Sequence, residues 1–466
     1  MDRREFIKHI TGAVAGTSLL LTACKEKGKS NHSANAESNP EDMTTRTNPN
    51  CGDKVSLLGY GMMRLPQREV EEGAPYELDQ ERINELVDYA LAHGVNYFDT
   101  APVYCKGLSE KATGIALARH PRSSYFVATK LSNFSQSAWP RKESMAMFER
   151  SLEYLQTDYV DYLLLHSVGG TSTGKDSMQT FYGRYMDNGI LDWLVEQKKK
   201  GRIRNLGFSY HGDVNIFDML LRWHDEGKYH WDFVQIQLNY LDWNHAKVQK
   251  ARNTNASYLY AELEKRGIPV VIMEPLLGGR LAKQPTHILR EMKRMDINAT
   301  PAEWAFRYAG TPEKILTVLS GMTYKEHLQE NCCTFSPLRP ITAEENTMLM
   351  QLADAICDLK AIPCTGCNYC MPCPYGIDIP SVFGYYNNSL AEDLLPNSDN
   401  KDSEFRKARR RWLIGYDKKV ERMRQADHCI GCNHCMSHCP QRINIPKEMR
   451  TINELVEELK QAEATL

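Results

Sequence analysis

The 466-residue sequence lacks two features that would assign it to a simple functional class. It has no excess of either charge, because 57 Lys and Arg residues against 59 Asp and Glu residues leave a net charge of −2. No face is therefore forced to be basic, which argues against a nucleic-acid-binding protein. Beyond the first 23 residues, no stretch is long and apolar enough to cross a membrane. We expect neither a nucleic-acid partner nor a membrane-spanning segment.

Residues 1–23 have the three parts of an export signal, namely a charged start, an apolar run and a short exit. The run ends at Ala23 and is too short for a bilayer, which needs about 20 apolar residues. The stretch "RREFIK", with Arg3 and Arg4, resembles the twin-arginine export consensus, and a general secretory leader is the alternative. "LTAC" resembles a lipoprotein processing box. The leader and this box together predict an exported protein, on the periplasmic side or the cell surface, whose only membrane attachment is a lipid anchor at Cys24.

The remaining sequence divides into three parts. Residues 24–50 are polar and contain almost nothing apolar, so we predict a disordered tether. The residues after position 50 are too many for one small core. We place two domains at 51–340 and 341–466, because a regular alternation of sequence patterns ends near Pro340.

That alternation consists of short β-branched or aromatic runs separated by amphipathic helical segments. Eight such runs occur, at 57–61, 95–98, 125–129, 160–165, 202–208, 233–238, 270–273 and 315–319. The pattern predicts an α/β fold, a (β/α)8 TIM barrel, whose functional groups come from the carboxyl ends of the strands. A doubly wound open sheet is the competitor, but no GxGxxG follows the first run. Residues 167–189, after the fourth run, predict a long polar loop at the same end.

Three consecutive strands end in ionisable side chains. "YFDTAPVY" contains Asp99 and Tyr104, "VATK" ends at Lys130, and "LLLH" ends at His166. These four residues, the tetrad, should converge at one mouth of the barrel. A phenol is a poor proton donor near neutral pH unless a neighbouring cation stabilises its phenolate, and Lys130 would supply that cation. Read singly, each residue has a structural interpretation as an ion pair, a strand-end histidine or a core aromatic.

With these motifs, residues 51–335 resemble the aldo-keto reductases. The resemblance implies reversible hydride transfer between a nicotinamide and a small-molecule carbonyl or alcohol, such as an aldehyde, ketone or sugar. Tyr104 would exchange the proton, Asp99 would hold Lys130, and His166 would orient the carbonyl.

The resemblance also implies a cofactor site for NADP or NAD. Ser209 and Gln235 would hold the nicotinamide carboxamide, although Tyr210 stands where the family has Asn. Met273 corresponds to the residue that stacks on the nicotinamide ring. The segment "LSGMTYKEHLQEN" matches the part that binds the adenosine end, where the residues implied are Gly321, Met322, Lys325, Glu330 and Asn331. The usual phosphate-binding Lys and Arg are replaced, and Lys325 is the substitute.

Eight of the fourteen cysteines form two regular groups near the C-terminus. "CTGCNYCMPCP" holds Cys364, Cys367, Cys370 and Cys373, and "CIGCNHCMSHCP" holds Cys429, Cys432, Cys435 and Cys439. Three thiolates at this spacing, with a fourth before Pro, are typical of bacterial two-cluster ferredoxins, whereas zinc modules separate two CxxC pairs by a longer loop. Two [4Fe-4S] clusters are therefore predicted. By the ferredoxin crossover, Cys439 would complete the first three thiols and Cys373 the second three.

The whole sequence predicts an exported oxidoreductase that joins a nicotinamide-dependent barrel to a ferredoxin-type domain with a possible redox partner protein. The alternative is an iron-sulfur electron-transfer or binding protein that uses the barrel as a scaffold. Hydride moves two electrons and each cluster accepts one, so direct exchange normally needs a flavin, and no flavin motif is present. The sequence does not identify the substrate.

Overall fold

The computed structural model describes residues 38–68, 76–249, 252–359, 361–396, 403–439 and 441–461, which all belong to one compact unit. The predicted export signal and Cys24 lie outside the described residues. Among the residues described, no helix is both long enough and apolar enough to span a bilayer.

Eight parallel strands close into a barrel in the order β10-β3-β4-β5-β6-β7-β8-β9. The strands are β3 (Leu58–Gly61), β4 (Tyr97–Asp99), β5 (Phe126–Leu131), β6 (Val160–Val168), β7 (Ile203–Tyr210), β8 (Phe233–Gln237), β9 (Val270–Met273) and β10 (Ile315–Ser320). Each of the eight predicted runs corresponds to one strand, so the barrel is confirmed and the open sheet is excluded. Pairing of β10 with β3 closes the circle, with Val318 opposite Leu58.

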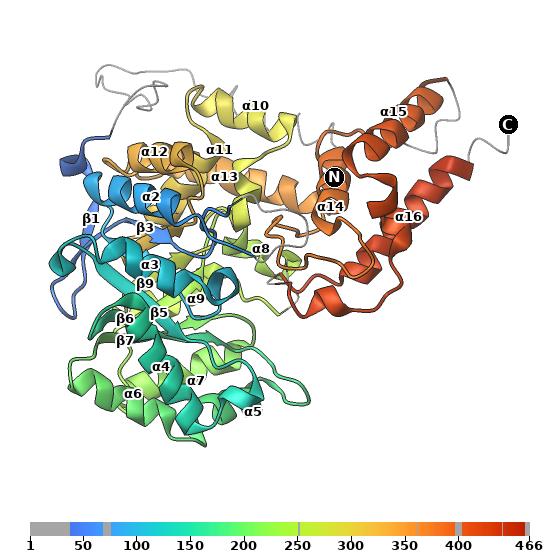
Figure 1. Cartoon of the computed structure of the whole chain (residues 1–466). Helices are drawn as coiled ribbons and strands as arrows, with labels where there is room; N and C mark the ends of the chain where they lie inside the picture. Colours follow the sequence, from blue (N-terminus) through green and yellow to red (C-terminus); the bar gives the residue numbers. More distant parts are fainter. Residues whose placement is uncertain are drawn as a thin grey trace, which may run out of the picture. The chain divides into compact units, whose positions relative to one another are not determined.

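Amphipathic helices surround the strands (Figure 1). In α2 (Gln80–Ala92), Asp79 caps the first turn and Ile83, Leu86 and Val87 are buried against the barrel. Gly94 then turns the chain with a φ of +83°. The other barrel helices are α3 (Ser109–Leu117), α4 (Arg141–Leu155), α6 (Ile190–Lys199), α7 (Val214–Asp225), α8 (Asp242–Gln249), α9 (Ala256–Lys265), α10 (Thr286–Met295), α11 (Pro301–Gly310) and α12 (Lys325–Thr334).

The tether predicted over 24–50 is wrong in its last part. β1 (Thr45–Thr47) pairs antiparallel with β2 (Lys54–Ser56), and this hairpin precedes the barrel. The guanidinium of Arg46 donates to the carbonyls of Pro312, Ile315 and Gly310 at 2.5, 3.0 and 2.8 Å. The segment has few apolar residues to bury, and these contacts with distant residues hold it in place instead.

The predicted domain boundary near Pro340 also lies too early. α13 (Ala343–Asp358) begins with a capping box between Thr342 and Glu345. Its buried face, with Leu349 and Leu352, belongs to the barrel core. A second core begins only at Ile362, so α13 completes the barrel because its apolar face packs there.

The second core is built from three helices and two cysteine-containing segments, one before the first helix and one before the last, which together form the cysteine module (residues 361–461). The helices are α14 (Ile379–Ala391), α15 (Ser403–Lys419) and α16 (Ile445–Gln461) (Figure 1). Phe383, Trp412, Tyr416 and Met449 fill its centre. The predicted α-helical second domain is thereby confirmed.

The loop predicted at 167–189 is partly helical. α5 (Ser177–Phe181) starts at a capping box formed by Asp176 and Gln179, and a π-helical turn follows over Tyr182–Met186. The π turn buries Arg184, whose guanidinium donates to the carbonyl of His166 at 2.6 Å. This segment therefore supports the end of β6.

Candidate active site and cysteine-lined hollows

The structure brings the predicted tetrad together at the carboxyl end of three neighbouring strands. Asp99 is the last residue of β4, Lys130 lies in β5 and His166 in β6. Tyr104 begins a short 3-10 turn five residues after Asp99. Because parallel strands end at the same face, four residues separated in sequence meet there.

Lys130 and Asp99 form a buried ion pair beneath the phenol. The Lys130 ammonium donates to Asp99 Oδ1 at 2.5 Å and to the Thr100 carbonyl at 2.8 Å, and only 1% and 4% of the two charged side chains are exposed. Burial raises the pKa of Asp99 and lowers the pKa of Lys130, and their mutual attraction opposes both effects. Lys130 Nζ lies 4.9 Å from the centre of the Tyr104 ring. The pair therefore places a fixed cation next to the hydroxyl-bearing ring.

Burial holds the pKa of Tyr104 well above its usual range, and the carboxylate of Asp99 adds to this effect. The phenol is consequently protonated near neutral pH. It is a proton donor that needs a compensating cation when the proton leaves, which is the part that Lys130 can play.

His166 is held as a neutral ring beside Tyr104. Burial lowers the pKa of His166 well below its usual value, and the nearby Lys130 charge lowers it further. Its Nδ1 shares a 2.6 Å hydrogen bond with the hydroxyl of Ser132. The His166 and Tyr104 ring centres are 5.8 Å apart and nearly perpendicular. An uncharged imidazole in this position can hydrogen-bond to a carbonyl oxygen without protonating it.

The residues expected to hold a nicotinamide lie at the same mouth. The hydroxyl of Ser209, near the end of β7, accepts from the Ser167 amide at 2.7 Å, and the Gln235 amide on β8 donates to Asp99 Oδ2 at 3.4 Å. Met273 ends β9 and is half-buried. Tyr210 instead packs on Phe217 among the helices, with ring centres 5.2 Å apart. The hydroxyl and amide of Ser209 and Gln235 fit a carboxamide, whereas position 210 supplies no amide.

The residues expected at the adenosine end lie on the connection after β10 (Gly321 and Met322) and in α12 (Lys325, Glu330 and Asn331). Met322 is buried and its carbonyl accepts from the Tyr60 hydroxyl, while the Asn331 amide donates to Ser320 Oγ at 3.1 Å. Glu330 accepts from Thr300, and Lys325 lies 5.4 Å from the Tyr89 ring centre. Gly321 leaves room beside Arg64, since an added Cβ would lie 3.5 Å from the nearest Arg64 atom.

The eight clustered cysteines line two separate hollows. Cys364, Cys367, Cys370 and Cys439 line the first hollow, and Cys373, Cys429, Cys432 and Cys435 line the second. These are the two sets that the ferredoxin crossover implied.

A shared local sequence shapes both hollows. Each motif reads C-x-G-C-N-x-C, and in each the Gly and the Asn have positive φ. The values are 63° for Gly366, 61° for Asn368, 75° for Gly431 and 62° for Asn433. Gly adopts this left-handed backbone without strain, and Asn tolerates it better than most residues. The repeated turns direct three thiols of each motif toward one hollow.

The thiols fit a group larger than one ion. Burial and the neighbouring sulfurs raise the pKa of Cys370 to about 12 and that of Cys435 to about 11, so these two thiols need a cationic partner to become thiolates. Throughout the described ranges, no three His, Cys, Asp or Glu side chains lie close enough together to hold a single metal ion. Sulfurs spread around a hollow suit an iron-sulfur cube better than a tetrahedral zinc ion.

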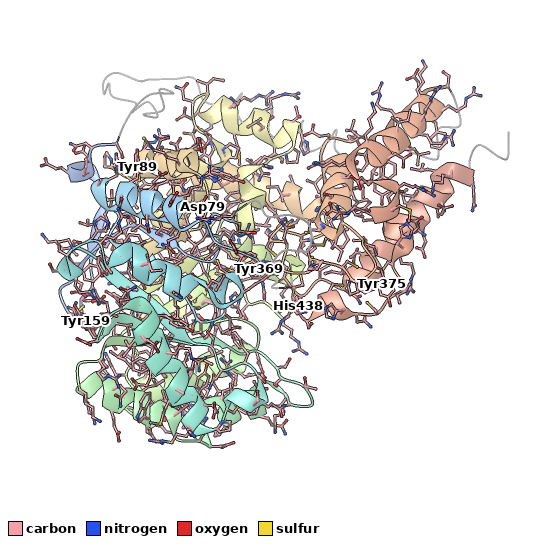
Figure 2. All side chains as sticks on the ribbon, viewed as in Figure 1. Asp79, Tyr89, Tyr159, Tyr369, Tyr375 and His438 are labelled. Atoms are coloured by element: carbon pink, nitrogen blue, oxygen red, sulfur yellow. The ribbon has the colours of Figure 1, made fainter. Side chains whose placement is uncertain are left out.

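Two residues near the first hollow reach the barrel mouth, and sequence reasoning did not single them out. Tyr369, between Cys367 and Cys370, donates to the Met63 carbonyl at 3.4 Å, and Figure 2 labels it. Gln441, two residues after Cys439, donates to the carboxylate oxygens of Glu274 at 3.2 and 3.3 Å. The only signal in the sequence was that both residues lie within two positions of a clustered cysteine.

Two protein families match the chain. The model of the aldo/keto reductase family matches residues 57–354, and that of a 4Fe-4S dicluster domain matches residues 363–445. L-galactose dehydrogenase from Arabidopsis thaliana is 25% identical over 316 residues, which are 64% of this chain and 90% of that protein. D-arabinose 1-dehydrogenase from Saccharomyces cerevisiae is 31% identical over 173 residues, 35% of this chain and 45% of that protein.

Solved structures share the barrel. An aldo-keto reductase from Bacillus halodurans in its holo form has a TM-score of 0.50 at 23% identity and covers 66% of this chain and 96% of its own. An aldo-keto reductase from Klebsiella pneumoniae in complex with NADPH also has a TM-score of 0.50, at 19% identity, over 67% of this chain and 95% of its own. At these identities the likeness establishes the fold.

Proposed function

Because the chain belongs to the aldo/keto reductase family and is thus an NAD(P)-dependent oxidoreductase, we propose that it interconverts a carbonyl and an alcohol at the tetrad. The observation that carries the proposal is the Lys130–Asp99 pair buried beneath the Tyr104 ring. A buried ion pair is costly to build for stability alone. Next to a buried phenol it has a chemical use, because it stabilises the phenolate.

The nicotinamide, when bound, gives or takes the hydride. In reduction, the carbonyl oxygen accepts hydrogen bonds from the Tyr104 hydroxyl and the His166 ring. Tyr104 then gives its proton to that oxygen as the carbon gains hydride, so the double bond becomes a C–OH single bond. Lys130 stabilises the phenolate until solvent returns the proton. In oxidation the same groups act in reverse, and the phenolate removes the hydroxyl proton.

We propose a sugar or related polyhydroxy aldehyde as the substrate. The two sugar dehydrogenases named above support this class, as do the polar residues of the 167–189 segment that follow His166. The cofactor is NADP or NAD, and Lys325 is the one basic residue proposed for the extra phosphate.

We further propose that the two hollows hold [4Fe-4S] clusters that pass electrons to a partner protein, and that the chain is exported by the twin-arginine route and anchored by lipid at Cys24. Iron-sulfur clusters are built inside the cell, so a chain that carries them is best exported already folded. Arg3 and Arg4 support that route, and the cysteine spacing supports the clusters.

The test is turnover by protein purified without oxygen. L-galactose and D-arabinose with NADP⁺ or NAD⁺ should give absorbance at 340 nm. Tyr104→Phe, which keeps the ring and removes the proton, should lower kcat by about 10²–10⁴-fold, the usual contribution of a general acid. Tyr258→Phe is the matched control, because Tyr258 is 42% exposed on α9. Full activity in Tyr104→Phe would show that Tyr104 does not exchange the proton, and a wild-type protein without turnover would favour the scaffold alternative.

A further inference from the structure

The turn that carries Tyr104 has an uncommon backbone. Cys105 and Lys106 follow Tyr104 and both have left-handed backbone angles, with φ of 50° and 54°. Two successive non-glycine residues in this region are strained, and such strain persists only where surrounding contacts hold it. Contacts from the surrounding structure must therefore hold this turn, and with it the phenol of Tyr104 next to Lys130.

The barrel supplies part of that support. The Cys105 thiol donates to the Met63 carbonyl at 3.4 Å, and the Ser109 hydroxyl donates to the Met62 carbonyl at 2.7 Å. Both carbonyls belong to the turn that follows β3. The turn after β4 is thus attached to the turn after β3.

The cysteine module supplies another part through Tyr369. Its hydroxyl donates to the same Met63 carbonyl that accepts from the Cys105 thiol, at 3.4 Å in both cases. Tyr369 is also close enough to Tyr104 for their phenols to interact electrostatically. Tyr369 and Cys105 therefore share one acceptor, the Met63 carbonyl, at the point where the turn that carries Tyr104 is attached to the turn after β3.

Tyr369 owes its own position to the first hollow. Cys367 and Cys370 flank it and both face that hollow. Two other contacts come from residues near the same four thiols. Arg64 donates to Thr365 Oγ1 at 3.2 Å, and Gln441 donates to Glu274. All three links run from the segments that line the first hollow to the mouth of the barrel.

We propose that Tyr369 is a positioning residue for Tyr104, so that the barrel reaches full activity only when the first hollow holds its metal group. The inference rests on the proposed function and extends it, since it gives the first hollow a role that needs no electron exchange with the nicotinamide. A metal group in the first hollow would hold the flanking thiols together and would thereby fix the backbone of residues 367–370. The Tyr369 hydroxyl then holds the 104–107 turn.

The test compares Tyr369→Phe and Tyr369→Ala with the control Tyr375→Phe. Tyr375 lies two residues after Cys373 beside the second hollow and is 46% exposed. Tyr369→Phe keeps the ring and loses the bridging hydroxyl. We expect it to lower kcat while KM, the nicotinamide Kd measured by fluorescence quenching, and the iron content stay at wild-type values. Tyr369→Ala should lower kcat by about 10²-fold, the scale for a misplaced reacting group.

A second measurement does not depend on turnover. Hydrogen exchange of the peptide covering 103–108 should be faster in both Tyr369 variants than in wild type, and unchanged in Tyr375→Phe. Equal exchange and wild-type kcat in Tyr369→Phe would overturn the inference, provided its iron content is intact. If wild type turns over no carbonyl or alcohol, the proposed function fails, and the exchange result still decides whether Tyr369 holds the turn.

Discussion

At the scale of single residues, the mouth of the barrel is governed by burial. The same loss of water that raises the pKa of Tyr104 lowers the pKa of His166, so both side chains are uncharged near neutral pH. The tetrad therefore contains one ion pair and two neutral hydrogen-bonding groups. Protonated Tyr104 is ready for reduction, whereas oxidation has to remove its proton first.

This charge state predicts a pH dependence. Because the folded protein keeps the pKa of Tyr104 raised, the oxidation rate should increase with pH into the alkaline range, and reduction should fall there. Replacing Lys130 by Met removes the cation that stabilises the phenolate. The alkaline rise should then move to still higher pH and kcat should drop. Initial rates of alcohol oxidation from pH 6 to 10 test this, with Lys111→Met, on the outer helix α3, as the control. An unchanged profile in Lys130→Met would show that Lys130 does not act on Tyr104.

At the scale of elements, two pieces outside the eight-strand pattern complete the barrel. The β1–β2 hairpin is attached through Arg46, and α13 adds its apolar face to the core. Both carry the polar character of exposed segments along much of their length. Their burial depends on partners that lie far along the chain, so neither local composition nor periodicity assigns them to the barrel.

Removal of the Arg46 guanidinium should measure how much the attachment of the hairpin contributes to the free energy of unfolding. Arg46→Ala removes a donor from the carbonyls of Gly310, Pro312 and Ile315, and of these Pro312 still accepts from the Ile315 amide. An unsatisfied buried polar group costs about 1–3 kcal/mol, so the free energy of unfolding should fall by an amount on this scale. Urea unfolding followed by circular dichroism gives the value. Arg82→Ala, an exposed change on α2, should leave the midpoint unchanged. A similar result for Arg46→Ala would mean that the hairpin is not coupled to barrel stability.

At the scale of the whole molecule, each hollow is closed by a thiol from the other end of the cysteine module. Cys439 joins the motif that starts at Cys364, and Cys373 joins the motif that starts at Cys429. The crossing joins the segment before α14 to the segment before α16. The segments that line the first hollow contact the barrel mouth. The second hollow is bordered by the exposed side chains of Tyr375 and Ile430.

The proposed crossed ligation of two clusters predicts which cysteine changes act on the same centre. Cys364→Ser and Cys439→Ser should each remove or alter the first centre, and the double variant should lose no more iron than either single one. Cys364→Ser combined with Cys373→Ser should disturb both centres. Iron content and electron paramagnetic resonance of the reduced protein distinguish these outcomes. Additive loss in the Cys364 and Cys439 double variant would contradict the shared hollow.

The sequence by itself determined the eight strands, the four residues at their ends and the eight clustered thiols, because each depends on a local pattern. Strand hydrophobicity, strand-end position and cysteine spacing are all read within a few residues. The tertiary structure alone decided that the hairpin and α13 belong to the barrel, that residues 177–186 are helical, and that Tyr369 reaches Met63 from 306 positions away. Such contacts depend on how complete surfaces pack, and a single sequence has no local signal for the partner.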